Sequence, residues 1–187
     1  MLLTASQPPS SAKQRILFAA HDLFYSKGIR ATGVDLIIAQ AKVTKTTFYR
    51  HFASKNLLIL AYLDYRHQIW LTWFSQHINS AKELVNGIES AITEWFSQDY
   101  FRGCAFINSL SEIAQTLPTV KQKVAEHKRD VAALIMTKLP ASTSRHAQAQ
   151  AIVMAIDGAI IRVQSGEDNQ HTIALLATTV TLLSNQK

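Results

Sequence analysis

The chain has 187 residues, of which 48% are hydrophobic and 17% charged, so it can bury a core and is not disordered throughout. Its formal charge of +6 lies in the first third: residues 1–56 hold eight cationic and two anionic side chains, whereas residues 57–187 hold eleven of each. This asymmetry is typical of a protein in which one domain meets a polyanion and the other does not.

The start of the chain and its apolar runs predict a soluble, cytoplasmic protein. Residues 1–11 lack the basic and apolar regions of a secretory signal, and residues 1–9 are predicted to form a disordered tail. The longest apolar run, residues 57–63, is far shorter than the ~18 to 20 residues of a membrane span. The single cysteine, Cys104, excludes an intramolecular disulfide. We therefore expect no membrane contact.

Apolar residues recur at helical spacing along nearly the whole chain, which predicts an all-α fold of about nine helices. A first helix over residues 12–27 ends at Gly28, which is suited to a left-handed cap. Thr32 and Asp35 resemble a capping box for a helix over residues 33–40. Thr44 is the predicted N-cap of a third helix that ends near residue 51.

Longer helices are predicted in the rest of the chain. Ser54 caps a fourth that carries residues 57–74, and Ser80 with Glu83 forms a capping box for a fifth that ends near residue 97. Prolines separate some of the later helices. Those helices are predicted over residues 103–115, 119–138, 142–164 and 170–183.

The second and third predicted helices have the proportions of a helix-turn-helix. In such a unit the first turn of the second helix enters a major groove, where it offers donors to base edges and its dipole favours phosphate. Phe48 and Phe52 are four residues apart and are predicted to face inward. The side chains then left facing outward are Lys45, Thr46, Thr47, Tyr49 and Arg50.

The segment VDLIIAQAKVTKTTFYRHFASKNLLILAY, residues 34–62, resembles the DNA-binding signature of the TetR family of transcriptional regulators, and the match spans about residues 13–62. The resemblance implies that Lys45, Thr46 and Thr47 read bases after the N-cap Thr44. It implies backbone contacts for Tyr49, His51 and Lys55, with Arg50 as a further candidate.

Two residues depart from the family pattern. Lys42 stands where the family usually has glycine, in a turn that needs a left-handed residue; a lysine there costs on the order of 1 kcal/mol. Thr46 also stands where glycine is common, which bears on the operator sequence.

Aromatic side chains concentrate in the neutral part of the chain, where core packing or a ligand pocket explains them. Cys104, Asn108 and Glu112 follow at i, i+4 and i+8 on the sixth predicted helix, which indicates either polar ligand contacts or ordinary packing with an inert cysteine. The family resemblance implies a pocket for a small, mainly apolar inducer. The candidate ligand residues are Trp70, Phe74, Trp95, Tyr100, Cys104, Asn108 and Glu112.

The last two predicted helices carry narrow apolar seams with three- and four-residue steps, typical of helix-on-helix packing. Intramolecular packing and a dimer interface explain the seams equally well. The resemblance favours a homodimer through residues of about 142–185, in which two reading helices about 34 Å apart match a palindrome. The seam residues are Ala149, Ile152, Ile156, Ala159, Val163, Ile173, Leu176, Val180 and Leu183.

No histidine pair or acidic cluster has metal-site spacing, and no phosphate loop or catalytic triad stands out, so we expect no metal, no cofactor and no enzyme activity. The resulting prediction is a repressor that binds a double-stranded DNA operator through residues 10–56, and binds inducer and dimerises through residues 57–187. Inducer is expected to act by moving the fourth helix. The alternatives are an electrophile- or redox-responsive regulator of the same family acting through Cys104, a thiol enzyme using Cys104, and a helical module that binds membrane surfaces.

Overall fold

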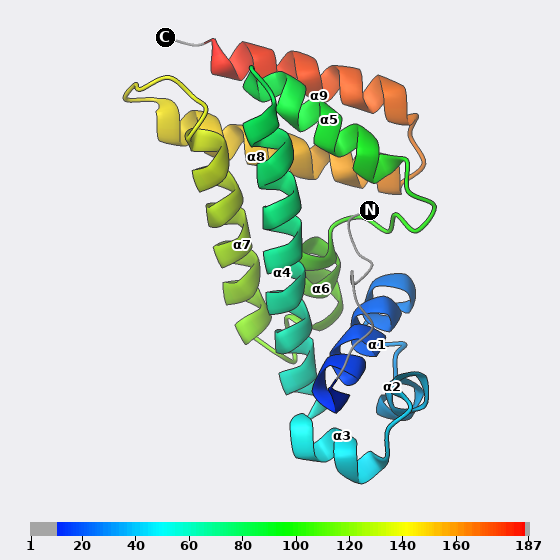
Figure 1. Ribbon diagram of the computed structural model, residues 1–187. Coiled ribbons are helices and arrows are strands. Elements are labelled where there is room, and N and C mark those ends of the chain that lie inside the picture. The colour runs from blue at the N-terminus through cyan, green and yellow to red at the C-terminus, as the bar shows by residue number, and fades with distance from the viewer. Residues whose placement is uncertain (1–10, 186–187) are drawn as a thin grey trace. The chain divides into compact units, whose positions relative to one another are not determined.

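The computed structural model describes residues 11–185, and every regular element in that range is an α-helix (Figure 1). The all-α prediction with about nine helices is confirmed for this part of the chain. None of the helices described is long and apolar enough to span a bilayer. The tail predicted over residues 1–9 lies outside the described residues. The helices are α1 (Ala12–Lys27), α2 (Val34–Ala41), α3 (Lys45–His51), α4 (Lys55–Ser80), α5 (Leu84–Phe96), α6 (Ala105–Ile113), α7 (Thr119–Met136), α8 (Arg145–Gln164) and α9 (Asn169–Ser184).

The chain divides into two compact units. The first contains the chain up to Ile69 together with Ala105–Val124, and the second contains Trp70–Cys104 together with the chain from Ala125 onward. Helices α4 and α7 each contribute to both units. The predicted functional boundary after residue 56 falls inside the first unit and stays a prediction.

Helix α1 has the bounds that the sequence predicted, and local chemistry explains both ends. A capping box closes its start: Ser11 Oγ accepts from the Gln14 N–H at 3.2 Å, and Gln14 Oε1 accepts from the Ser11 N–H at 3.3 Å. At the other end Gly28 adopts φ 88°, which favours glycine. The buried face of α1, which includes Ile16, Ala20 and Phe24, packs against α2 and α3 in the first unit.

Two predicted N-caps are wrong, because each hydroxyl bonds to the helix that precedes it. Thr32 Oγ1 donates to the Gly28 carbonyl at 2.7 Å, and α2 is capped by Gly33 instead. Ser80 is the last residue of α4, and its Oγ donates to the His77 carbonyl at 3.1 Å. Helix α4 extends this far because Ile78 is also buried, and α5 begins only after Glu83.

In the second unit, α9 packs against both α5 and α8, and the three helices run alongside one another in Figure 1. Seven of the nine predicted seam residues are buried within the single chain. These residues therefore pack within one chain, which is the intramolecular alternative for the apolar seams. They are Ala149, Ile152, Ile156, Ala159, Ile173, Leu176 and Val180.

Candidate functional site

The turn between α2 and α3 has the left-handed geometry that the family resemblance implies, although Lys42 replaces the usual glycine. Lys42 lies in the left-handed region, with φ 51° and ψ 53°, and among the described residues it is the only non-glycine with positive φ. Its N–H donates to the Ala39 carbonyl at 3.2 Å, and the Val43 N–H donates to Ile38 at 3.3 Å. These bonds close the end of α2 and direct the chain into α3.

Thr44 caps α3 as predicted. Its Oγ1 accepts from the Thr47 N–H at 3.1 Å, which satisfies one of the free donors at the helix start. The two hydroxyl oxygens of Thr44 and Thr47 are also within 2.9 Å of each other. Thr47 was predicted to face outward; it is half-buried, because its hydroxyl takes part in the cap.

Helix α3 separates a buried aromatic face from an exposed polar face. Phe48 and Phe52 are buried as predicted. Tyr49 is 45% exposed, and its ring packs edge-on against Phe48 with centroids 5.2 Å apart. Three cations and two threonine side chains are also exposed around the turn and α3, which gives this face the composition of a phosphate- and base-contacting surface. They are Lys42, Thr44, Lys45, Thr46 and Arg50.

Long-range contacts from α1 and α4 support this unit. Arg15 donates through Nε to the Ala41 carbonyl at 3.2 Å and so caps the end of α2. Lys55 donates through Nζ to the Ile29 carbonyl at 2.6 Å and lies 5.9 Å from the ring centroid of Phe24. Neither contact has a local sequence signal, since each spans 26 positions.

Lys55 is therefore half-buried and bound to the α1–α2 turn, defined here as residues 28–33. Burial lowers the pKa of its ammonium group, and the carboxylate of Glu112 acts in the opposite direction. The phosphate contact implied for Lys55 stays a prediction. His51, for which the resemblance also implies a contact with the DNA backbone, is half-buried as well.

Glu112, a predicted ligand contact, meets the same turn within the first unit. It accepts a hydrogen bond from the Arg30 N–H at 3.0 Å, and its Oε2 would lie 3.1 Å from a Cβ placed on Gly28. Asn108 is half-buried in the same unit. Cys104 belongs to the second unit and precedes α6, which begins at Ala105, so the predicted helical stripe does not extend to it.

The remaining predicted ligand residues differ in their surroundings. Trp70, Phe74 and Trp95 are buried in the second unit, where Trp70 stacks on Phe74 with centroids 4.6 Å apart. Tyr100 is exposed in the loop after α5. Its neighbour Phe101, which is not among the predicted ligand residues, packs against Trp95 with centroids 5.5 Å apart.

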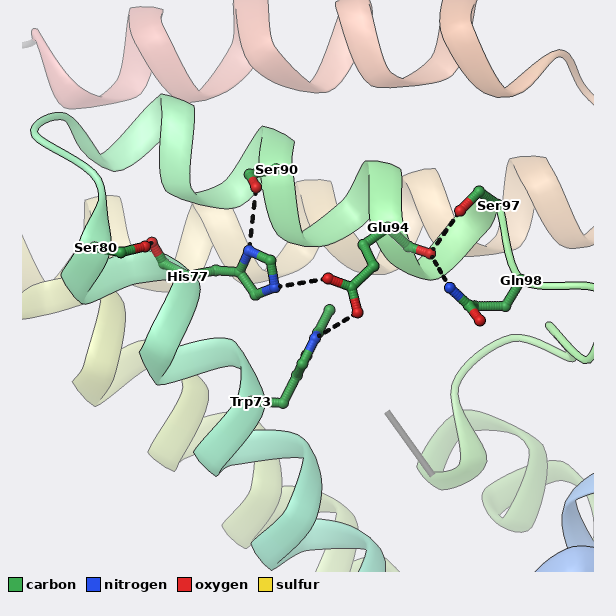
Figure 2. Close-up of polar contacts among 7 residues, drawn as sticks. All are labelled: Trp73, His77, Ser80, Ser90, Glu94, Ser97 and Gln98. Carbon is green, nitrogen blue, oxygen red and sulfur yellow. Dashed lines mark hydrogen bonds and ion pairs between the residues drawn. The ribbon is translucent and has the colours of Figure 1, made fainter. Parts of the chain in front are cut away.

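A row of hydrogen bonds joins α4 to α5 beside these aromatic rings (Figure 2). Trp73 Nε1 donates to Glu94 Oε1 at 3.1 Å, and His77 Nε2 lies 3.2 Å from Glu94 Oε2. His77 Nδ1 lies 3.1 Å from Ser90 Oγ. Both carboxylate oxygens of Glu94 are therefore engaged. No sequence pattern indicates this row, because its members come from two different helices.

Cys104 is buried in the second unit, with the Lys128 ammonium 3.9 Å from its sulfur. Lys128 is also paired with Asp157. Within the described residues no group of three or more histidine, cysteine or acidic side chains is placed to hold a metal ion.

The capped, cation-bearing α3 behind a left-handed turn defines a helix-turn-helix DNA-binding protein. Residues 16–62 match the family model described as bacterial regulatory proteins, tetR family. An HTH-type transcriptional regulator from the lacX 3′ region of Lactococcus lactis subsp. lactis is 25% identical over 175 residues, which cover 84% of this chain and 86% of that protein. Residues 16–62 therefore carry the DNA-binding domain of the TetR family of transcriptional regulators, whose members are DNA-binding proteins and not enzymes.

Solved structures agree over nearly the full length. A TetR-family transcriptional regulator from Streptomyces coelicolor is 28% identical with a TM-score of 0.81, covering 92% of this chain and 93% of that one. The multidrug binding protein EbrR, solved in complex with malachite green, is 20% identical with a TM-score of 0.73, covering 95% of this chain and 100% of that one. The second likeness shows the fold alone.

Proposed function

We propose that the protein is a cytoplasmic, ligand-responsive repressor that binds a palindromic operator as a homodimer and is released by a small, mainly apolar inducer. The exposed first turn of α3 carries the proposal: Lys45 and Thr46 project from a capped helix whose opposite face is anchored by Phe48. Residues 10–56 contact DNA, with Lys45, Thr46 and Thr47 assigned to bases. The remaining DNA-binding residues are assigned to contacts with the DNA backbone or to support of the residues that make them. They are Thr44, Tyr49, Arg50, His51 and Lys55.

Exposed apolar side chains on α8 and α9 support the dimer. Met154 is 74% exposed and Leu182 64%, and Ile161 and Leu175 are exposed as well. Gly158, on the same helix as Met154, has nothing within 4 Å of an added Cβ, which leaves room for close approach of another helix. Leaving several large apolar side chains in water is unfavourable, and a second copy of the same face covers them. The proposed interface uses these residues rather than the buried seam.

The buried aromatic cluster of the second unit supports an inducer site within residues 57–187. Aromatic side chains with few polar groups are typical of small-molecule sites in helical proteins. The malachite green complex of EbrR shows an aromatic ligand bound by a protein of the same fold. Helix α4 continues from the DNA-binding part into this cluster, so we propose that it carries the response. Coupling of this kind is typically ~1 to 3 kcal/mol, or about 5- to 150-fold in affinity.

Selection of bound sites from random DNA tests the proposal, followed by a screen of small molecules for release of the selected operator. We expect one enriched palindrome, and compounds that release wild-type protein from it. The control is Arg129→Ala, which changes an exposed cation outside the DNA-binding residues. Phe48→Ala is unsuitable as a control, because Phe48 is buried and its removal opens the core. The absence of an enriched sequence would contradict the DNA-binding role, and an operator that no compound releases would contradict the inducer role.

A second candidate function, sensing of electrophiles through Cys104, is favoured by one observation. The Lys128 ammonium lies 3.9 Å from the Cys104 sulfur, and a neighbouring cation is typical of reactive cysteines. The test is operator release by N-ethylmaleimide in the wild type and in Cys104→Ser. Release that depends on Cys104, with a single adduct on that residue by mass spectrometry, supports sensing; equal release from both proteins contradicts it.

A further inference from the structure

The three tryptophans of the chain lie together in the second unit. Ring centroids are 5.9 Å apart for Trp70 and Trp73, 5.8 Å for Trp70 and Trp95, and 6.4 Å for Trp73 and Trp95. His127 packs edge-on against Trp70 at 5.3 Å. The rings are close enough for one bound aromatic molecule to contact several of them.

The polar ends of these tryptophans differ in a way that points to a ligand. Trp73 Nε1 donates to Glu94 Oε1 at 3.1 Å (Figure 2). Trp70 and Trp95 are 5% and 1% exposed, and the buried Nε1 of each has no hydrogen-bond acceptor among the described residues. One indole N–H in the cluster is therefore satisfied by the protein, and two are not.

An indole N–H is a donor only, and burial removes it from water. Buried polar groups in folded proteins are almost always paired, because a buried donor without a partner loses its hydration and gains nothing in return. Two unpaired donors in the same aromatic cluster therefore indicate a site for acceptors that the described residues do not supply.

We propose that the inducer is a flat, uncharged aromatic compound with a carbonyl or ring-nitrogen acceptor, and that Trp70 and Trp95 donate hydrogen bonds to it. This inference rests on the ligand-responsive function proposed above. The aromatic neighbours favour a flat ring, which they contact by stacking and edge-on packing. The ligand is uncharged because Glu94 already binds Trp73 and His77, and Lys128 is paired with Asp157, which leaves neither side chain to pair with a buried ion.

Quinoline and naphthalene form a matched pair of probes, since they have the same shape and differ in one ring nitrogen that accepts a hydrogen bond. Intrinsic tryptophan fluorescence reports binding at the cluster itself. A cluster without free donors favours naphthalene, because quinoline must lose its hydration to enter. We expect the wild type to bind quinoline at least about fivefold more tightly than naphthalene. Equal affinities, tighter naphthalene binding, or no quinoline binding up to its solubility limit would overturn the proposal.

Single Trp→Phe variants locate the donors. We expect Trp70→Phe or Trp95→Phe, or both, to lose the preference for quinoline, and Trp73→Phe to keep it because its indole is already bonded to Glu94. A preference that survives in both Trp70→Phe and Trp95→Phe overturns the proposal. Because Trp95 is fully buried, 3-benzothienylalanine, which keeps the ring shape without the N–H, replaces phenylalanine if Trp95→Phe does not fold.

Operator release separates this inference from the function on which it rests. If quinoline binds with the expected pattern but no compound ever releases DNA, the assignment of the donors stands and the ligand-responsive function fails. If a compound releases DNA equally well from the wild type and both indole variants, the function stands and the donor assignment fails.

Discussion

The carboxylate of Glu112 accepts a hydrogen bond from the Arg30 N–H at 3.0 Å, across 82 positions of sequence. The carbonyl of the preceding residue, Ile29, accepts a hydrogen bond from Lys55 Nζ at 2.6 Å. Two oppositely charged side chains, from α6 and α4, thus fix two successive backbone groups of the α1–α2 turn. This turn leads directly into the helix-turn-helix, so these contacts set the position from which α2 begins.

Removing the Glu112 acceptor is expected to loosen the first unit. We expect Glu112→Ala to lower the free energy of unfolding by about 0.5 to 1.5 kcal/mol, and Glu112→Gln to retain most of it because the amide oxygen still accepts. Ser111→Ala is the matched control, since the Ser111 hydroxyl bonds only within its own helix, to the Asn108 carbonyl. Urea unfolding measures the difference. Equal midpoints for the Glu112→Ala and Ser111→Ala variants would show that the contact with Arg30 adds no stability.

Lys45 and Lys55 are expected to affect DNA binding differently. Lys45→Ala should cost about 1 to 3 kcal/mol on the preferred operator and relax sequence preference, because we propose that its exposed side chain contacts base edges. Lys55→Gln should weaken all DNA about equally, because supporting the turn and touching a phosphate both act without regard to sequence. Titrations at several salt concentrations separate these two roles of Lys55, since only a phosphate contact reduces the salt slope by about one. Loss of affinity by Lys45→Ala equally on every sequence would contradict the base-reading role.

Acid is expected to destabilise the first unit through His21. This imidazole is buried, its Nε2 accepts from Arg66 Nη1 at 3.3 Å, and Arg66 is itself buried. Burial lowers the pKa of His21 below its ordinary value, the neighbouring Asp22 opposes the shift, and the charge of Arg66 adds to it. Below pH about 6.5, His21 binds a proton in the unfolded chain but remains neutral in the folded chain. The free energy of unfolding therefore falls as the pH drops toward the lowered pKa of His21.

The size of this effect is bounded by one proton, or about 1.4 kcal/mol per pH unit. We expect His21→Gln to flatten the dependence of unfolding free energy on pH between about 6.5 and 5, whereas His146→Gln, at an exposed histidine, leaves it unchanged. Parallel curves for the wild type and His21→Gln would show that His21 does not carry the acid sensitivity.

A charge on the proposed dimer face is expected to separate the protomers. Met154→Glu or Leu182→Glu places an unpaired carboxylate in an apolar interface, and we expect the dimer dissociation constant to rise at least about tenfold, or 1.4 kcal/mol. Leu110→Glu is the control, since it changes an exposed leucine of the first unit. Sedimentation velocity measures the shift to monomer. Retention of the dimer in both interface variants would place the interface elsewhere.

Local patterns in the sequence predicted the features that depend on neighbours in the chain. The ends of α1, the cap at Thr44 and the buried pair Phe48 and Phe52 follow from spacing alone. Lys42 was predicted in a left-handed turn by the family resemblance, and the backbone has that conformation. At Thr32 the spacing is compatible with a hydrogen bond to either neighbouring helix. The hydroxyl bonds to the end of the preceding helix, so the predicted N-cap was wrong.

Contacts between distant residues had no such signal. Nothing in the spacing of Glu112 or Lys55 indicates that both bind the turn at Ile29 and Arg30. The apolar seam of α8 and α9 has the same period whether it packs inside one chain or between two chains. The sequence therefore could not show that Ile156 is buried within the chain while Met154 is exposed.

In the proposed function, one dimer reads two half-sites about one helical turn apart on the same face of the DNA. Its most direct test is the affinity for the selected operator after insertion of about five base pairs, half a turn, between the half-sites. We expect the affinity to fall to that of a single half-site, because one pair of α3 helices no longer reaches both grooves. Unchanged affinity, with two protomers bound independently, would contradict it.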